Sequence, residues 1–136
     1  MKETLLLTLA LAILLVGCRE EDNPYKEFEK ERLGELAVEK YEAMLKLAQA
    51  TSCTDPAEWK IAEINSVCGI SHFAYHQSTD EKRLRELIQD YNILMEVYIP
   101  HIAPLVDCLP HREPTGVACK AGKAVVEYPE YTRKAD

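Results

Sequence analysis

Apolar side chains recur every three or four residues in two stretches of the chain, and this spacing predicts two amphipathic helices. The first stretch begins at Asn23, a capping residue followed by proline, and continues to about Ala50. The second begins at Ser78, which has Glu81 three residues later as in a capping box, and should end at Pro100. The polar face of the second helix has too few Lys and Arg for a membrane-surface helix, so we expect it to pack on a core.

Strand signals lie between the two helical stretches. Residues 59–64 alternate between apolar and polar side chains, and residues 70–76 are rich in β-branched and aromatic side chains. We expect a β-hairpin here, with Cys53 and Cys68 near its ends. A short helix over residues 57–64 is the alternative.

A second hairpin is predicted near the C-terminus, where residues 117–119 and 124–128 flank a turn in which Gly122 supplies a positive φ. Together the elements predict an α+β fold, in which two amphipathic helices and two short β-hairpins form one domain over residues 24–128. A solvated tail over residues 129–136 follows. The residues expected in the core are Trp59, Phe73, Tyr75, Tyr91 and Leu94.

The first 17 residues have the pattern of a secretion signal. Lys2 provides a positive charge, which Glu3 offsets, and residues 5–16 form an apolar run interrupted only by Thr8. This run is shorter than the ~20 residues with which a helix crosses a bilayer. Residues 1–17 therefore predict a signal peptide.

The signal ends in Leu15-Val16-Gly17-Cys18, which resembles the bacterial lipobox. The resemblance implies that diacylglycerol is attached to the Cys18 thiol and that the chain is cut before this residue. It also implies that a further acyl chain, such as palmitate, is added to the new amine. Acyl chains of this kind hold a protein on a membrane surface. An unmodified cysteine after an ordinary secretion signal, or a short buried helix, is the alternative.

Residues 18–23 are expected to form an acidic tether. Position 19 is arginine rather than the aspartate associated with inner-membrane retention, so we expect an outer-membrane or cell-surface location. The run Arg19-Glu20-Glu21-Asp22 resembles the acidic stretch that directs some Bacteroidota lipoproteins to the cell surface. A solvated spacer that carries no sorting information is the alternative.

Four cysteines remain once Cys18 is assigned to lipid attachment. An even number in an oxidising compartment predicts two disulfides, for which three connectivities are possible. We favour Cys53–Cys68 together with Cys108–Cys119, because each pair flanks a short segment. A zinc site is not expected, since such sites normally contain closely paired cysteines.

A set of cysteine, aromatic and small residues recurs along the mature chain, at Cys53-x₅-Trp59-Lys60, Cys68-Gly69, Ala74-Tyr75, Asp107-Cys108 and Pro114-x-Gly116-Val117-x-Cys119-x-x-Gly122-Lys123-x-Val125. With these residues the chain, from about residue 53 to residue 128, resembles a group of small four-cysteine Bacteroidota lipoproteins. The resemblance implies secretion, lipidation and a four-cysteine domain, and it implies no activity. The chain departs from the group after Cys68, where a second glycine and a proline are expected.

The composition and the motifs limit the chemistry of the chain. A formal net charge of −7 at pH 7 argues against nucleic acid as a partner. The common catalytic and nucleotide-binding motifs do not occur, so we expect neither an enzyme nor a cofactor. His72 and His76 would share a face, but their neighbours supply no third ligand, and we expect no metal site. The leading expectation is a lipid-anchored protein that presents a small interaction domain to an envelope or extracellular protein.

The segment between Cys108 and Cys119 has the features of a rigid binding loop. Pro110 and Pro114 stiffen it, Arg112 lies between them, and a disulfide would close it. This pattern predicts the alternative function, a protease-inhibitor-like module that inserts Arg112 into an acidic pocket. The simpler interpretation is a structural crossing between helix and hairpin.

Overall fold

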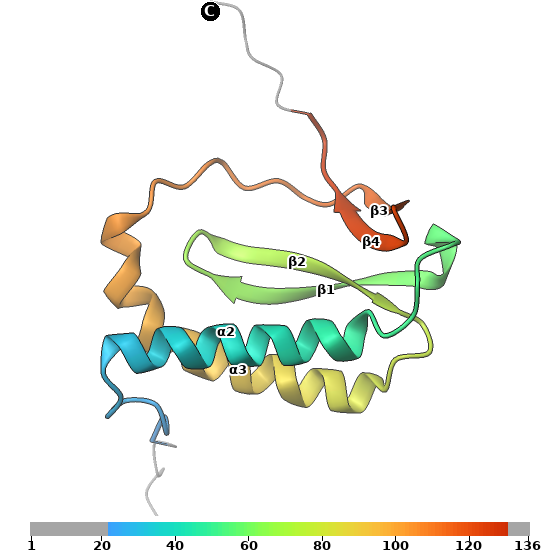
Figure 1. Cartoon of the computed structure of the whole chain (residues 1–136). Helices are drawn as coiled ribbons and strands as arrows, with labels where there is room; N and C mark the ends of the chain where they lie inside the picture. Colours follow the sequence, from blue (N-terminus) through green and yellow to red (C-terminus); the bar gives the residue numbers. More distant parts are fainter. Residues whose placement is uncertain (1–21, 131–136) are drawn as a thin grey trace, which may run out of the picture.

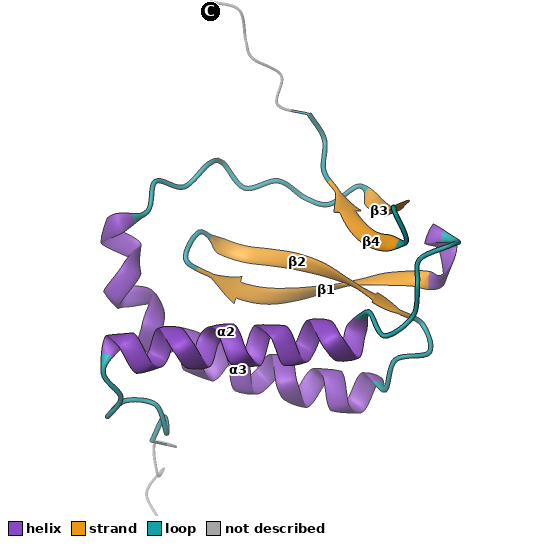
Figure 2. Cartoon of the chain, viewed as in Figure 1, coloured by secondary structure: helices purple, strands orange, loops and turns teal. Residues whose placement is uncertain are grey.

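The computed structural model describes residues 22–130, which form an α+β fold of three layers (Figure 1). The two helices lie side by side, the β1–β2 hairpin covers them, and the β3–β4 hairpin lies beyond it (Figure 2). The predicted fold class is confirmed, with two helices, two hairpins and two disulfides. The elements are α2 (Lys30–Ala48), η1 (Pro56–Glu58), β1 (Trp59–Ser66), β2 (Gly69–His76), α3 (Glu81–Ile102), η2 (Ala103–Leu105), β3 (Gly116–Lys120) and β4 (Lys123–Glu127).

The signal peptide, the lipid-attachment residue Cys18 and most of the acidic tether lie outside the described residues, as do residues 131–136. In the part of the chain that is described, no helix combines the length and the apolar character that a bilayer crossing demands.

The β1–β2 hairpin forms the middle layer because its side chains alternate between two apolar environments. Ile64 and Phe73 are buried against the helices, whereas Trp59 and Ala74 are buried on the opposite face, against the second hairpin. The predicted hairpin is confirmed, and the alternative of a short helix over residues 57–64 is wrong. The 3₁₀ turn of η1 is the only helical structure between residues 53 and 66.

The β3–β4 hairpin closes through a two-residue turn, since Lys120 pairs with Lys123. Both turn residues have positive φ, 50° at Ala121 and 75° at Gly122. Positive φ at both central positions is typical of a type I′ turn, whose twist matches that of the strands it joins. The predicted role of Gly122 is confirmed.

The first helix begins at Lys30, six residues later than the proline at position 24. Asn23 accepts a hydrogen bond from the Tyr25 N–H at 3.0 Å, but this bond closes a separate turn. The side-chain amide of Asn23 also donates to the Ile93 carbonyl of α3 at 2.7 Å. The prediction of a helix start at Asn23 is therefore wrong, because this side chain instead connects the segment before α2 to α3.

The second helix differs from its predicted limits at both ends. Its cap is Asp80, which accepts a hydrogen bond from the Arg83 N–H at 3.0 Å, rather than Ser78. The helix also passes through Pro100 and ends at Ile102. A proline removes the bond to the carbonyl four residues earlier, and here that carbonyl belongs to Glu96, an exposed position where water can replace the bond.

The disulfides join Cys53 to Cys119 and Cys68 to Cys108, so the predicted local pairing is wrong. Strand β1 separates Cys53 from Cys68, and its eight residues extend about 26 Å, at ~3.3 Å per residue. A disulfide needs Cα atoms within about 7 Å. The observed partners have Cα–Cα distances of 5.3 and 5.4 Å, within this limit. Each bond joins the hairpin region to a segment that is distant in the sequence but packs beside it.

The core lies between the helices and the middle layer, with a smaller cluster under the second hairpin. Four of the five predicted core residues are buried. Tyr75 is the exception, because it packs at the margin of the main cluster and stays partly exposed. The four are Trp59, Phe73, Tyr91 and Leu94.

Candidate interaction site

Strand β2 has one edge that faces away from β1, and the main-chain groups on this edge belong to alternate residues. The Gln77 N–H donates to the Glu58 carbonyl at 2.8 Å, which fixes the pairs of this antiparallel ladder that are hydrogen-bonded. It follows that the N–H and C=O groups of Ile70, His72 and Ala74 point away from β1.

Bonds from outside the hairpin agree with this alternation. The Ala74 carbonyl accepts a hydrogen bond from the Gln49 side-chain amide at 3.4 Å. On the opposite edge, the Asn65 N–H donates to the Asn92 side chain at 2.9 Å. Both contacts involve main-chain groups that point away from the β1–β2 ladder. The bond from Gln49 closes the β2 edge at Ala74.

The edge remains open between Ile70 and His72. Within residues 22–130, no hydrogen bond occupies the outward main-chain groups of these two residues. The His72 side chain is only 3% exposed, yet the residue as a whole is half-buried, so its accessible surface belongs mainly to the main chain. Ile70 is 42% exposed. An open edge of this kind can pair with another chain.

A hollow of about 280 Å³ runs along the β2 edge. Tyr41 and Leu45 of α2 form one wall, and Val125 and Tyr128, in β4 and just after it, form the other. The floor is β2 itself, at residues 72–74. The walls therefore present apolar and aromatic side chains on both sides of an open strand edge.

Two further hollows continue the first. One, of about 430 Å³, lies between α2 and α3 and shares Tyr41 and Leu45 with it. The other, of about 380 Å³, lies between β2 and the loop at 107–112, and shares His72 and Tyr128. We call these three hollows the β2 groove. Four of the seven exposed large apolar side chains within residues 22–130 border it. They are Val38 (58% exposed), Ile70 (42%), Leu109 (72%) and Val125 (37%).

His72 and Tyr128 form the centre of the groove. The His72 Nδ1 lies 3.2 Å from the Tyr128 hydroxyl, and the two ring centroids are 5.9 Å apart. Burial raises the pKa of Tyr128, the Arg112 guanidinium acts in the opposite direction, and Tyr41 adds to the increase.

Arg112 lies against the groove wall. Its guanidinium is 5.2 Å from the centroid of the Tyr128 ring, and it donates to the Pro129 carbonyl at 2.8 Å. The predicted closure of this loop by a Cys108–Cys119 disulfide is wrong, since both cysteines pair elsewhere. The loop is instead held at one end by Cys108 and along its length by contacts of Arg112.

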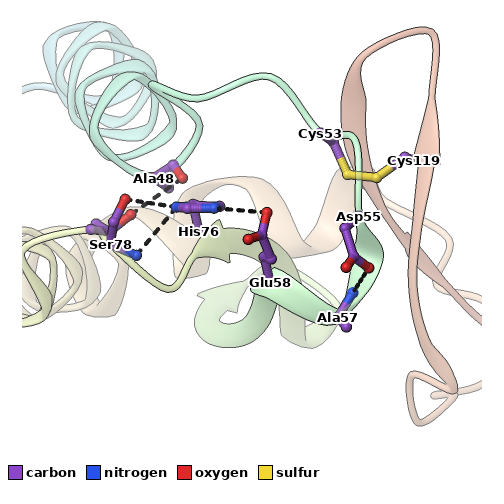
Figure 3. Close-up of polar contacts among 9 residues, drawn as sticks. Ala48, Cys53, Asp55, Ala57, Glu58, His76, Ser78 and Cys119 are labelled. Carbon is purple, nitrogen blue, oxygen red and sulfur yellow. Dashed lines mark hydrogen bonds and ion pairs between the residues drawn. A yellow bond between two sulfur atoms is a disulfide. The ribbon is translucent and has the colours of Figure 1, made fainter.

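The two strand histidines share a face, as predicted, but they have different partners. His76 has its Nδ1 2.7 Å from the Ser78 hydroxyl and its Nε2 3.6 Å from Glu58 (Figure 3). His72 instead faces Tyr128 and lies 3.8 Å from a carboxylate oxygen of Glu63. Across residues 22–130, no three His, Cys, Asp or Glu side chains gather closely enough to hold a metal ion.

Comparison with protein-family models, with curated proteins and with solved structures finds no match to this chain. The groove residues were only partly visible in the sequence. Tyr41 and Leu45 belong to the predicted apolar stripe of the first helix, but periodicity does not separate core from groove positions. Nothing in the sequence indicates that Ile70 and His72 lie on an open edge, because this depends on the sheet ending at β2.

Proposed function

We propose that this chain is a lipid-anchored lipoprotein of the outer membrane or cell surface, whose domain is a non-enzymatic interaction module. The lipobox at Leu15 to Cys18 supports the anchor. The β2 groove supports the interaction, since it joins exposed apolar side chains to an open strand edge. The groove is the observation on which the interaction function rests. The partner class is an envelope or extracellular protein.

The chemistry of the groove is suited to protein binding. Apolar and aromatic walls release water when a partner covers them, and contiguous exposed apolar surface on a small protein is commonly an interaction site. The disulfides of Cys68 and Cys119 hold the surrounding segments in place. A groove that is ordered before binding loses little conformational entropy when a partner docks.

The anchor would hold this surface near a membrane. The first described residue, Asp22, follows Cys18 by four positions (22 − 18), and four residues extend at most about 14 Å. The domain therefore has little freedom to leave the membrane surface, and the proposed partners are proteins of the same membrane or proteins that reach it.

The anchoring is tested by replacing Cys18 with alanine in cells. We expect the wild-type protein in the membrane fraction, with acyl groups on its mature N-terminal peptide by mass spectrometry. The variant should remain unprocessed or be released. A wild-type N-terminal peptide without acyl groups, and unchanged fractionation of the variant, would exclude the anchor.

The interaction is tested by photo-crosslinking in cells, with a photoreactive amino acid at Val125 in the groove or at Lys82 on the exposed face of α3. We expect one envelope or extracellular protein to be crosslinked from Val125 and not from Lys82. Equal crosslinking from both positions, or none from either, would exclude the groove as an interaction site.

A further inference from the structure

We propose that the β2 groove binds an extended segment of a partner polypeptide, which adds a strand to the β2 edge at Ile70 and His72. This inference rests on the proposed function and deepens it by naming the binding mode. It follows from the main-chain groups, the walls and the charge of the groove.

The open main-chain groups select a polypeptide in extended conformation. Ile70 and His72 offer N–H and C=O groups at the spacing of alternate residues in a strand. Only another extended backbone presents complementary groups at the same spacing, and strand addition at a sheet edge is an established mode of peptide recognition. The Gln49 contact to Ala74 sets the limit of the pairing towards the C-terminal end of β2.

The walls suit the side chains of such a strand. Successive side chains of an added strand point to opposite faces of the sheet. Those on the helix side meet Tyr41 and Leu45, and those on the other side meet Val125 and Tyr128. Apolar residues at alternate positions of the partner segment therefore cover one of the two walls, and side chains at the intervening positions meet the other.

The hollow between the helices favours a basic residue in the partner segment, whereas Arg112 lines the hollow at the other end of the groove. Glu42 lines the hollow between the helices, beside Val38, and no ion pair within residues 22–130 neutralises it. A Lys or Arg side chain of the partner segment can pair with this carboxylate where the segment passes Tyr41 and Leu45, which line both hollows. The net charge of −7 also attracts basic segments in general.

A second copy of this chain is a poorer occupant. The β2 edge of another copy carries its own α2 and β4 walls, which would meet the walls of the first copy before the two edges could pair. A single extended segment has no such walls. The proposal therefore commits to a segment of a partner protein.

The test uses the purified, oxidised mature protein and a defined probe, the acetylated and amidated hexapeptide Lys-Val-Thr-Val-Thr-Val. Binding is followed by NMR, through chemical shifts and hydrogen exchange of assigned main-chain amides. We expect the Ile70 and His72 amides to shift and to gain protection from exchange. The amide of Ala62, inside the existing ladder, serves as the internal control and should not change.

Methylation of the peptide nitrogens separates main-chain pairing from simple apolar contact. One peptide is methylated at alternate residues and a matched peptide at the remaining residues. We expect one of the two to bind about tenfold more weakly and the other to bind like the parent, because only one set of N–H groups faces β2. Equal affinity for both peptides would overturn the inference and leave an interaction groove of another kind.

Variants of the protein provide independent tests. Ile70→Pro removes an outward N–H that takes no part in the ladder, and should abolish binding, whereas Ile70→Val should retain it. Glu42→Lys should reverse the preference for the lysine peptide over the same peptide with glutamate. Retained binding by a folded Ile70→Pro variant, or an absence of binding at millimolar peptide, would overturn the inference, while the crosslinking at Val125 still decides the proposed function.

Two other occupants would be recognised in the same experiment. Protection of Ile70 and His72 without peptide, lost when residues 131–136 are removed, would mean that the chain's own C-terminal segment occupies the edge. Protection that rises with protein concentration, together with a dimeric mass, would mean that a second copy does. Either outcome would overturn a partner segment as the occupant.

Discussion

Cys68, at the tip of the β1–β2 hairpin, is bonded to Cys108, which follows α3 by six residues (108 − 102). The bond joins residues that are 40 positions apart in the sequence. It fixes the loop at 107–112 beside the face of β2 that carries His72. This loop forms one side of the β2 groove, so the disulfide contributes both to stability and to the shape of the proposed binding surface.

Each disulfide should contribute substantially to stability. The sequence separations are 66 and 40 residues, and loops of this length correspond to about 4 kcal/mol each through the restricted unfolded chain. We expect the Cys68→Ser/Cys108→Ser double variant to lower the free energy of unfolding by about this amount in denaturant titrations. Non-reducing peptide mapping should give the Cys53–Cys119 and Cys68–Cys108 peptides, and a Cys53–Cys68 peptide would contradict the structure.

A carboxylate on α3 connects this helix to α2 and to the segment that precedes α2. Asp90 accepts a hydrogen bond from the Tyr25 hydroxyl at 2.5 Å and another from the Lys40 ammonium group of α2. Burial raises the pKa of Asp90, but the bonds from Lys40 and Tyr25 outweigh it, so the pKa lies below its ordinary value.

The pKa of Asp90 predicts a loss of stability in acid. A carboxyl whose folded-state pKa is lowered stabilises the protein above its unfolded-state pKa of about 3.9, and this contribution disappears as the pH falls through the folded-state value. We expect Asp90→Asn to cost about 1 kcal/mol at pH 6, since the side chain is 46% exposed, with the difference from wild type shrinking below pH 4. Glu86→Gln, in an exposed pair, is the control and should change stability by less than about 0.5 kcal/mol.

The turn of the second hairpin offers a stabilising substitution. Ala121 has a φ of 50°, a conformation that costs a residue with a Cβ about 1 kcal/mol, and asparagine tolerates it better. We expect Ala121→Asn to raise the free energy of unfolding by about 0.5 kcal/mol. Gly122→Ala should lower it by about 1 kcal/mol or more, because φ is 75° and the new Cβ would lie 3.0 Å from the Ser52 hydroxyl. Equal effects of the two substitutions would contradict the type I′ geometry.

The position of Arg112 gives an expectation for protease inhibition. Its guanidinium lies over the Tyr128 ring and donates to the Pro129 carbonyl, whereas an inhibitory arginine has to enter the pocket of the protease. We expect the purified protein to leave the rate of a trypsin-like protease unchanged at high micromolar concentration. Inhibition that Arg112→Ala abolishes, without a matching loss of stability, would revive the inhibitor interpretation.

The predictions that succeeded from sequence rest on local patterns. Periodic apolar residues identified both helices, alternation identified β1, and glycine at 122 identified a turn that needs positive φ. Helix limits were less accurate, since Asn23 and Ser78 have the chemistry of caps but use it elsewhere, in contacts with Ile93 and His76. A capping residue can bond to whichever donor or acceptor the fold brings close.

The sequence by itself determined the types of element, their order and the presence of two disulfides, because each of these depends on neighbouring residues or on composition. Only the tertiary structure decided which cysteines pair and which strand edge stays open. Cys53 meets Cys119, and Ile70 faces the groove, because helix packing and the second hairpin place distant segments beside β2. Such proximities depend on how whole elements pack, and no spacing within the chain encodes them.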